Sequence, residues 1–254
     1  MWNLELEELD ASVVKRIPIR FDDEDRYFPG ERFQLLPHDG YTRVFGNILN
    51  HARIVVSLDR PFDPSMLSSY AHCFNSMSID EFFGYRFGVL PYRSIRFHDT
   101  RVVWMPNPGA AATVNFTDNG PLTRATDWSL LPNHRVQFGP HVTITSEEPC
   151  DHSANSGERY YPVKRSDGRN EILYGRYRAL AEQIPKLTFI GRCGTYRYLD
   201  MHQVINQSLR HAHVWLETNG RVTAAHRKTG ARSSMKPSSR RAAVNKPGNW
   251  RPKN

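Results

Sequence analysis

The distribution of hydrophobic residues predicts a helix followed by a strand in the first third of the chain. Apolar side chains recur at helical spacing between Val44 and Leu49, so we predict a helix that begins near Gly40. Residues 54–58 form a short run rich in apolar and β-branched residues, which is typical of a buried strand. This part of the sequence therefore predicts a helix–strand unit of an α/β domain.

A second unit of this kind is predicted near the other end of the chain. Residues 187–190 suit a buried strand, and Gly191 and Gly194 then permit a tight turn and a close approach of the backbone to a ligand. Asp200 is suited to cap a helix whose apolar side chains recur from Met201 onwards. Such a corner directs free N–H groups and a positive helix end towards one point, which attracts phosphate or the polar edge of a cofactor.

The residues between the turn and this helix carry suitable chemistry. Arg192, Tyr196, Arg197 and Tyr198 could hold an anion and stack on a planar ring. No G-x-G-x-x-G pattern is present, however, so an ordinary strand–helix corner with surface aromatic residues is an equally good interpretation of the pattern alone.

Between the two units the pattern changes to short alternating segments separated by turn residues. These segments predict a largely antiparallel sheet with one face available for a ligand. A helix with apolar residues on one face is predicted at 171–183. The predicted strands are 92–97, 101–104, 112–116, 135–138 and 141–145. The fold class predicted for the whole chain is α/β, of the α+β kind.

Composition limits the classes of protein that need consideration. A chain of 254 residues can bury a hydrophobic core and form one or two domains. No apolar run approaches the length of a membrane span, and the acidic N-terminus lacks the basic and apolar regions of a signal peptide. The cysteines Cys73, Cys150 and Cys193 are far apart and form no C-x-x-C pair. Reduced thiols in the cytoplasm are therefore expected, rather than a disulfide framework or a zinc site.

The net charge of +8 comes from the C-terminal end of the chain and not from the residues before it. Ten Lys or Arg residues and no acidic residue lie in 221–254, so subtracting ten from +8 leaves −2 for the remainder. A solvated, disordered tail is the favoured interpretation of this segment, and weak binding to nucleic acid or acidic lipid is the alternative. His202, His211 and His213 have no carboxylate or cysteine at ligand spacing, so no metal site is predicted.

A long motif connects the predicted corner to a known family. The run 191–205, Gly-Arg-Cys-Gly-Thr-Tyr-Arg-Tyr-Leu-Asp-Met-His-Gln-Val-Ile, resembles the C-terminal flavin-contacting motif of UDP-galactopyranose mutases. The resemblance extends from Trp2 to about Leu216. Further matching motifs are 79–88, 115–118 with 123–124, and 159–163.

The resemblance implies roles for individual residues. It places the substrate at Trp2, Arg16, Tyr27, Phe28, Asn115, Arg124, Tyr161 and Tyr198. It places the flavin at Gly40, Tyr41, Thr42, Arg192, Tyr198, Asp200, Met201 and His202. Arg16 and Arg124 would hold the diphosphate of the substrate, for which a guanidinium is geometrically well suited.

The reaction implied by the resemblance is an isomerisation on reduced FAD. UDP-galactopyranose and UDP-galactofuranose would interconvert through a covalent bond between flavin N5 and the sugar, for galactofuranose-containing cell-surface polysaccharide. No side chain is assigned a catalytic role, because the cofactor carries the difficult step. The expected partners are UDP-galactose and either a separate N-terminal FAD-binding chain or a second copy in a homo-oligomer, without nucleic acid or a membrane span.

Several departures from the family pattern support a second hypothesis. The family begins with a dinucleotide-binding β-α-β unit that carries a glycine-rich turn, and this sequence contains none. Asn75-Ser76-Met77-Ser78 replaces the usual Tyr-Thr-Gly-Pro, and Ser146 replaces a basic residue. The alternative is therefore a non-catalytic, truncated remnant, or a sugar-nucleotide-binding partner that needs a separate FAD domain.

The expected division of the chain follows from the motifs. An incomplete FAD-binding Rossmann-like domain would combine with an antiparallel-sheet substrate domain. The expected parts are a mobile substrate loop with a helix remnant (1–30), an FAD-domain remnant (31–78), the substrate domain (79–185), an FAD-domain strand and helix (186–217) and a basic disordered tail (218–254).

Overall fold

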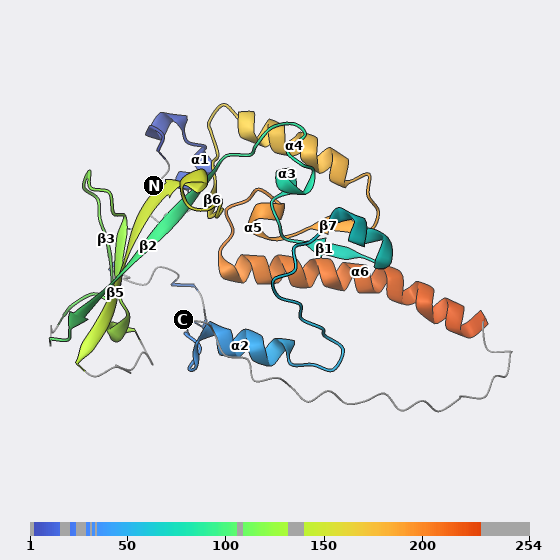
Figure 1. Cartoon of the computed structure of the whole chain (residues 1–254), viewed down its shortest axis with the longest axis horizontal. Helices are drawn as coiled ribbons and strands as arrows, with labels where there is room; N and C mark the ends of the chain where they lie inside the picture. The colour runs from blue at the N-terminus through green and yellow to red at the C-terminus, as the bar shows by residue number, and fades with distance from the viewer. Residues whose placement is uncertain are drawn as a thin grey trace. The chain divides into compact units, whose positions relative to one another are not determined.

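The structure is a computed structural model, and it describes most of the chain before the basic end. The described residues are 3–15, 21–23, 29–30, 32–33, 35–105, 109–131 and 140–229, with side chains in the last helix described up to Asn219. The chain divides into two compact units, Met1–Gln207 and Ser208–Asn254. The first unit holds all of the strands (Figure 1).

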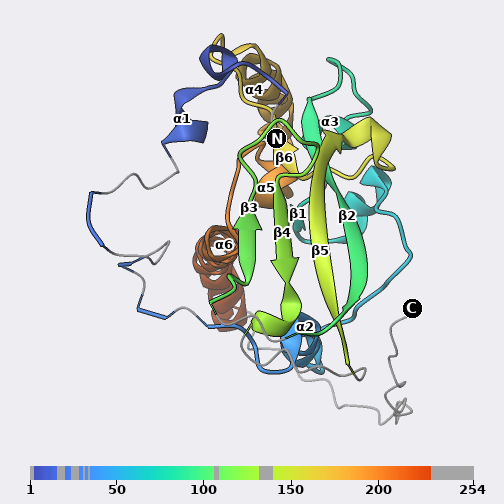
Figure 2. The ribbon, with the colours of Figure 1, turned by 90° about the vertical axis from the view of Figure 1, so that its left-hand side faces the viewer.

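A five-stranded antiparallel sheet forms the middle of the first unit. Its spatial order is β3-β4-β5-β2-β6, and Figure 2 shows β3, β4, β5 and β2 side by side. The strands are β2 (Tyr92–Val103), β3 (Thr113–Asn115), β4 (Arg124–Asp127), β5 (His141–Asp151) and β6 (Tyr161–Pro162). The prediction of an antiparallel sheet is therefore confirmed.

The central strand pair of this sheet, β2 with β5, is longer than predicted. β2 pairs with β5 along its length, from Arg93 opposite Asp151 to Val103 opposite His141. The two predicted strands 92–97 and 101–104 are therefore one strand, because the polar residues between them also pair with β5. The predicted strand at 135–138 lies outside the described residues.

The two ends of the fold meet in a short parallel sheet. β1 (Cys73–Asn75) pairs with β7 (Leu187–Phe189), with Cys73 opposite Leu187. The predicted strand at 187–190 is thus confirmed. The glycine turn after it is a short helix, α5 (Gly191–Gly194), and α6 (Met201–Thr229) follows. Because α6 continues to Thr229, residues 218–229 extend the helix into the segment expected to be a tail.

The remaining elements are short helices and one longer helix that covers the core. The predicted helix at 171–183 is α4 (Arg169–Ala181). The other helices are η1 (Leu6–Glu8), α1 (Ala11–Val14), α2 (Gly40–Leu49), η2 (Pro64–Ser69), α3 (Ile79–Phe82), η3 (Trp128–Leu130) and η4 (His152–Ala154).

The core joins α3, α4, the start of β2 and the segment after α5. Its buried cluster consists of Ile79, Leu90, Tyr92, Tyr177, Ala181 and Tyr196. Buried tyrosines need hydrogen-bond partners. The hydroxyl of Tyr177 accepts a bond from the N–H of Phe87 and donates one to the carbonyl of Gly88. The hydroxyl of Tyr196 lies 2.8 Å from the carbonyl oxygen of Val163. These bonds fix the segment that carries the corner.

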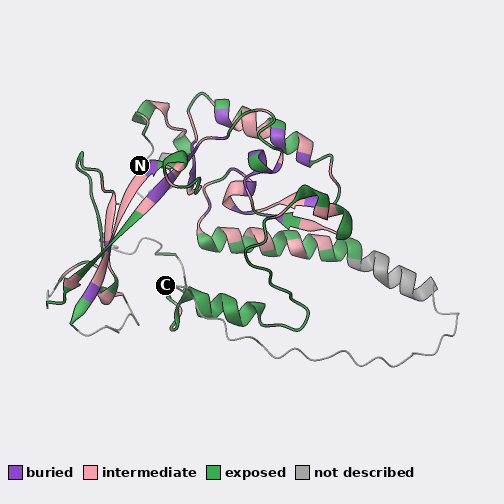
Figure 3. Ribbon diagram, viewed as in Figure 1, coloured by how far each residue is buried: buried purple, intermediate pink, exposed green. Residues whose placement is uncertain are grey.

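The helix–strand unit predicted in the first third of the chain is only half confirmed. The helix is present as α2, but residues 54–58 form no strand and are all exposed. The apolar face of α2 is exposed as well, and Figure 3 shows this helix without a buried residue. The prediction of a buried strand is wrong for the described structure because no neighbouring strand covers this run.

Candidate functional site

The glycine corner predicted from the sequence is held by hydrogen bonds to its own backbone. Gly191 has a φ of +74°, a conformation that favours glycine. Its N–H donates to Gln207 Oε1 at 2.6 Å, and its carbonyl accepts a bond from the hydroxyl of Thr195 at 2.6 Å. The start of α6 is therefore tied to the end of β7, and the residues between them have a fixed conformation.

Arg192 is the residue that organises this corner. Its Nε and Nη2 atoms donate to the carbonyl of Leu199, at 3.1 and 2.6 Å, and its Nη1 donates to the carbonyl of Tyr160 at 2.8 Å. The guanidinium carbon also lies 4.6 Å from the ring centre of Tyr198. A lysine could not make this set of planar contacts. Arg192 thus joins the corner to the segment that precedes β6.

Two tyrosines from these segments stack on each other beside Arg192. The ring centres of Tyr161 and Tyr198 are 5.0 Å apart, and their planes are nearly parallel, at 3°. Burial raises the pKa of Tyr161 well above its ordinary value, and the neighbouring Tyr198 adds to the rise. The hydroxyl of Tyr161 is therefore neutral near pH 7 and can donate a hydrogen bond to an anion.

The antiparallel sheet contributes an arginine and its two partners. Arg124 on β4 donates from Nε to Asn115 Oδ1 on β3, at 3.1 Å. It lies opposite Glu147 on β5, and Arg124 Nη1 is 3.6 Å from Glu147 Oε1. The side chain of Arg124 is 44% exposed, so its guanidinium is positioned by the sheet but still reachable by a ligand.

Tyr160 connects the antiparallel sheet to the glycine corner. Burial raises the pKa of Tyr160, the charge of Glu147 raises it further, and the charge of Arg192 opposes the rise. Phe97 on β2 also contacts Tyr160, with ring centres 5.9 Å apart. Tyr160 therefore contacts Phe97 of the sheet through its ring and Arg192 of the corner through its carbonyl oxygen.

The structure brings together part of the residue set expected from the sequence. Asn115, Arg124, Tyr161, Arg192 and Tyr198 belong to the sheet and the corner described above. Asp200, Met201 and His202 lie at the start of α6, where Met201 is half-exposed. Gly40, Tyr41 and Thr42 form the exposed first turn of α2. The expected substrate residues Trp2, Arg16, Tyr27 and Phe28 lie outside the described residues.

The corner fits one edge of a flavin rather than a whole FAD. Tyr198 and the start of α6 present an aromatic face and helix N-terminal N–H groups, which suit the polar edge of an isoalloxazine ring. Among the described residues, no hydrogen bond or ring contact joins the start of α2 to this corner. The residues of this chain would hold the flavin ring, and nothing in the described part cradles a pyrophosphate.

Three residues of this region were not identified from the sequence. They are Glu147, Tyr160 and Phe97. Glu147 could be recognised only from the register that places β5 beside β4, because its local sequence marks it merely as one of two adjacent acids. Tyr160 and Phe97 acquire their importance from contacts between distant segments, which periodicity does not report.

The described residues show no grouping that would suit a metal ion, that is, three or more His, Cys, Asp or Glu side chains close together. Cys73, Cys150 and Cys193 are all free thiols. Nor does any helix in the described part have the length and apolarity needed to cross a membrane.

A sheet that presents an arginine next to a tyrosine-lined glycine corner is an arrangement suited to an anionic ligand beside aromatic rings. The sequence model of the UDP-galactopyranose mutase family matches residues 1–198, and the chain belongs to that family.

Individual relatives agree with this assignment. The chain is 34% identical over 218 residues to the probable UDP-galactopyranose mutase of Klebsiella pneumoniae, covering 85% of this chain and 55% of that protein. It is 32% identical over 224 residues to the dTDP-fucopyranose mutase of Escherichia coli, covering 86% of this chain and 58% of the relative. The UDP-galactopyranose mutase of Mycoplasma pneumoniae is 30% identical over 230 residues, with coverages of 85% and 57%. The chain thus spans about half the length of the curated relatives it matches.

Proposed function

We propose that this chain forms the substrate-binding part of a UDP-galactopyranose mutase, which interconverts UDP-galactopyranose and UDP-galactofuranose. The observation that carries the proposal is the position of Arg124 on the sheet face shared with Glu147, together with the Tyr161–Tyr198 stack beside Arg192. This arrangement offers one exposed guanidinium and two tyrosine hydroxyls to a diphosphate. Charge-assisted bonds of this type are among the stronger ones in proteins.

In this proposal each residue has a binding or positioning role. Arg124 binds the diphosphate, and Asn115 and Glu147 hold its guanidinium in place. Tyr161 and Tyr198 donate to phosphate oxygens, and Arg192 fixes the position of Tyr198. Arg16, Tyr27, Phe28 and Trp2 would complete the substrate site, as the family motif implies. The expected domain division remains part of the proposal, with 79–185 as the substrate domain.

The cofactor is part of the proposal too. Reduced FAD, when bound, would supply the nucleophile that attacks the anomeric carbon of the sugar. Tyr198, Asp200, Met201 and His202 would hold the ring, and the exposed start of α2 at Gly40, Tyr41 and Thr42 would add a further contact. The remainder of FAD would be held by the portion of the family proteins that this chain does not span.

A second candidate function is favoured by the uncovered apolar surface on α2 and residues 54–58. A chain that binds the sugar nucleotide but cannot hold FAD would be a non-catalytic partner or remnant. The two functions share the substrate site and differ only in the cofactor, so one experiment can separate them.

The test combines the 254-residue chain with the N-terminal part of the Klebsiella pneumoniae relative that it does not match. UDP-galactose affinity is measured by calorimetry, and turnover of UDP-galactofuranose is measured with FAD and dithionite. Replacing Arg124 by Ala should weaken binding about ten- to a hundredfold, because a charge-assisted bond contributes about 1.5–3 kcal/mol. The matched control is Arg60→Ala, which removes an exposed arginine outside the sheet.

The outcomes distinguish the two functions. Turnover that disappears in the Arg124→Ala variant supports the mutase. Binding that depends on Arg124 without turnover in any combination assigns the non-catalytic role. Equal affinities of the Arg124→Ala and Arg60→Ala variants would show that the sheet arginine does not bind the substrate.

A further inference from the structure

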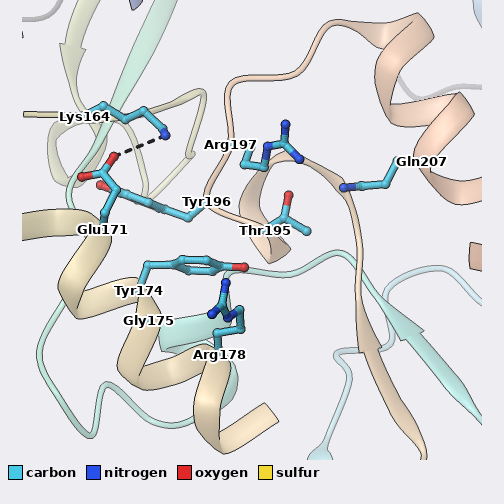
Figure 4. Close-up of a pocket in the computed structure, with 9 residues that line it drawn as sticks. All are labelled: Lys164, Glu171, Tyr174, Gly175, Arg178, Thr195, Tyr196, Arg197 and Gln207. Carbon is cyan, nitrogen blue, oxygen red and sulfur yellow. Dashed lines mark ion pairs between the residues drawn. The ribbon is translucent and has the colours of Figure 1, made fainter. Parts of the chain in front are cut away.

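A pocket of about 480 Å³ lies between α4 and the segment that follows α5. Pockets of this size commonly hold small molecules. Its lining includes Tyr174 and Arg178 from α4, Thr195 and Arg197 from the segment before α6, and Gln207 from α6 (Figure 4). None of its lining residues is among those proposed above to bind the sugar nucleotide or the flavin.

Two arginines face this pocket from different elements. The guanidinium of Arg197 makes no hydrogen bond or ion pair with a residue in the described ranges. Arg178 is engaged only through Nε, which lies 3.3 Å from Glu182 Oε1 in an exposed pair within α4. Burial raises the pKa of Tyr174, and the charges of both arginines oppose the rise, so both lie close to its hydroxyl. This end of the pocket has two positive charges and a neutral hydroxyl donor.

Gln207 adds a further donor at the same end. Because its Oε1 accepts the N–H of Gly191, the orientation of the amide is fixed. Its Nε2 is then directed towards Arg197 and Thr195, as Figure 4 shows. Two guanidinium groups, a phenol and an amide suit a tetrahedral group with three terminal oxygens better than a planar carboxylate, which offers two.

The other end of the pocket has a carboxylate that is paired with a lysine. Both carboxylate oxygens of Glu171 are buried, and Lys164 Nζ lies 3.3 Å from Oε1 as an ion pair. If the Lys164 side chain turned outwards, hydroxyl groups of a ligand could donate to this carboxylate. Figure 4 shows this pair at the opposite end of the pocket from Gln207.

The middle of the pocket is open because α4 has a glycine there. A side chain at Gly175 would meet no atom within 4 Å, so the space above it is free. Glycine within a helix costs about 0.5–1 kcal/mol relative to alanine, which the fold of α4 itself does not require.

We propose that this pocket binds a sugar phosphate. The phosphate lies between Arg178 and Arg197, with Tyr174 and the amide of Gln207 as additional donors. The sugar lies over Gly175, and its hydroxyls reach Glu171. This site is separate from the one at Arg124, and it does not depend on the function proposed above.

The first test is calorimetric titration of the full chain with glucose 6-phosphate. Arg178→Gln and Arg197→Gln should each weaken binding about ten- to a hundredfold, since each removes a charge-assisted bond to the phosphate. The matched control is Arg210→Gln, which removes the same charge from an exposed position on α6. Absence of binding at millimolar concentrations, or equal affinity in all three variants, overturns the proposal.

A second variant separates loss of the site from loss of folding. Gly175→Leu adds helix propensity and puts a side chain, whose Cβ would meet no atom within 4 Å, at the lining of the pocket, so it should abolish binding while circular dichroism stays unchanged. Arg124→Ala should bind glucose 6-phosphate normally, and loss of binding in this variant would place the ligand at the other site and overturn the proposal. Glucose should not bind. If inorganic phosphate binds as tightly as glucose 6-phosphate, the pocket recognises the anion alone and the sugar assignment is wrong.

Discussion

Gly194 and Gly175 are both helical glycines, but their surroundings differ. A Cβ atom on Gly194 would lie 3.0 Å from the carbonyl oxygen of Asn75 and 3.3 Å from the ring of Phe189. The backbone of α5 therefore approaches β1 as closely as a hydrogen side chain allows. At Gly175 the same atom would meet nothing within 4 Å.

Gly194→Ala should destabilise the protein by about 1–3 kcal/mol, because the backbone of β1 cannot move away easily. Gly175→Ala should instead stabilise it by about 0.5–1 kcal/mol through helix propensity. Urea denaturation followed by circular dichroism measures both changes. Equal stabilities of the two variants would show that the close approach at Gly194 is not maintained in solution.

Among the elements, the β1–β7 pair is the one whose stability should depend most clearly on pH. His72 immediately precedes β1, and its Nε2 lies 2.9 Å from the Thr188 hydroxyl on β7. Burial lowers the pKa of His72 below its ordinary value of 6.5. The unfolded chain then binds a proton at a higher pH than the folded chain does. The contribution to stability is fully present above pH 6.5 and is lost as the pH falls through the folded pKa.

We therefore expect the urea midpoint of the wild-type protein to fall between pH 7.5 and about pH 5.5 by more than that of His72→Gln. The variant retains a polar side chain near Thr188 but has no group that titrates in this range. The comparison removes the contributions of the other histidines, which are common to both proteins. Parallel curves for the two proteins would exclude His72 as the source of pH dependence.

The sequence predicted individual elements better than their partners. The helices α2 and α4 and the strand β7 follow from local periodicity, which depends on residues close together in the chain. The pairing of Arg124 with Glu147 depends on the register between β4 and β5. The local sequence of either strand does not determine that register. The prediction at 54–58 failed for a related reason. Hydrophobicity indicates a segment that needs covering, and it cannot indicate whether the covering element is present.

At the scale of the whole molecule, the uncovered apolar surface determines how the chain behaves alone. Phe45 is 46% exposed, Ile48 60% and Val55 90%, all within α2 and the run after it. A concentration of exposed apolar side chains in one stretch of the chain is typical of a site of association or a cause of aggregation. It supports the proposal that another polypeptide is needed for function.

The 254 residues expressed alone should bind the dye 8-anilinonaphthalene-1-sulfonate, lose FAD on gel filtration and show little or no mutase turnover. Adding the part of the Klebsiella pneumoniae relative that this chain does not match should reduce dye fluorescence as the apolar surface is covered. Size-exclusion chromatography of the mixture reports whether a complex forms. A yellow, active preparation of the 254 residues alone would refute this expectation.

The parallel pairing of β1 with β7 also constrains the order of events during synthesis. Cys73 cannot meet Leu187 until the ribosome has translated and released everything between them, including all five strands of the antiparallel sheet. Closing so long a loop costs more conformational entropy than pairing β2 with β5, although the cost rises only slowly with length. The β2–β5 pair can therefore assemble while β1 still lacks β7. The glycine corner, which carries Arg192, is among the last parts of the fold that a growing chain can complete.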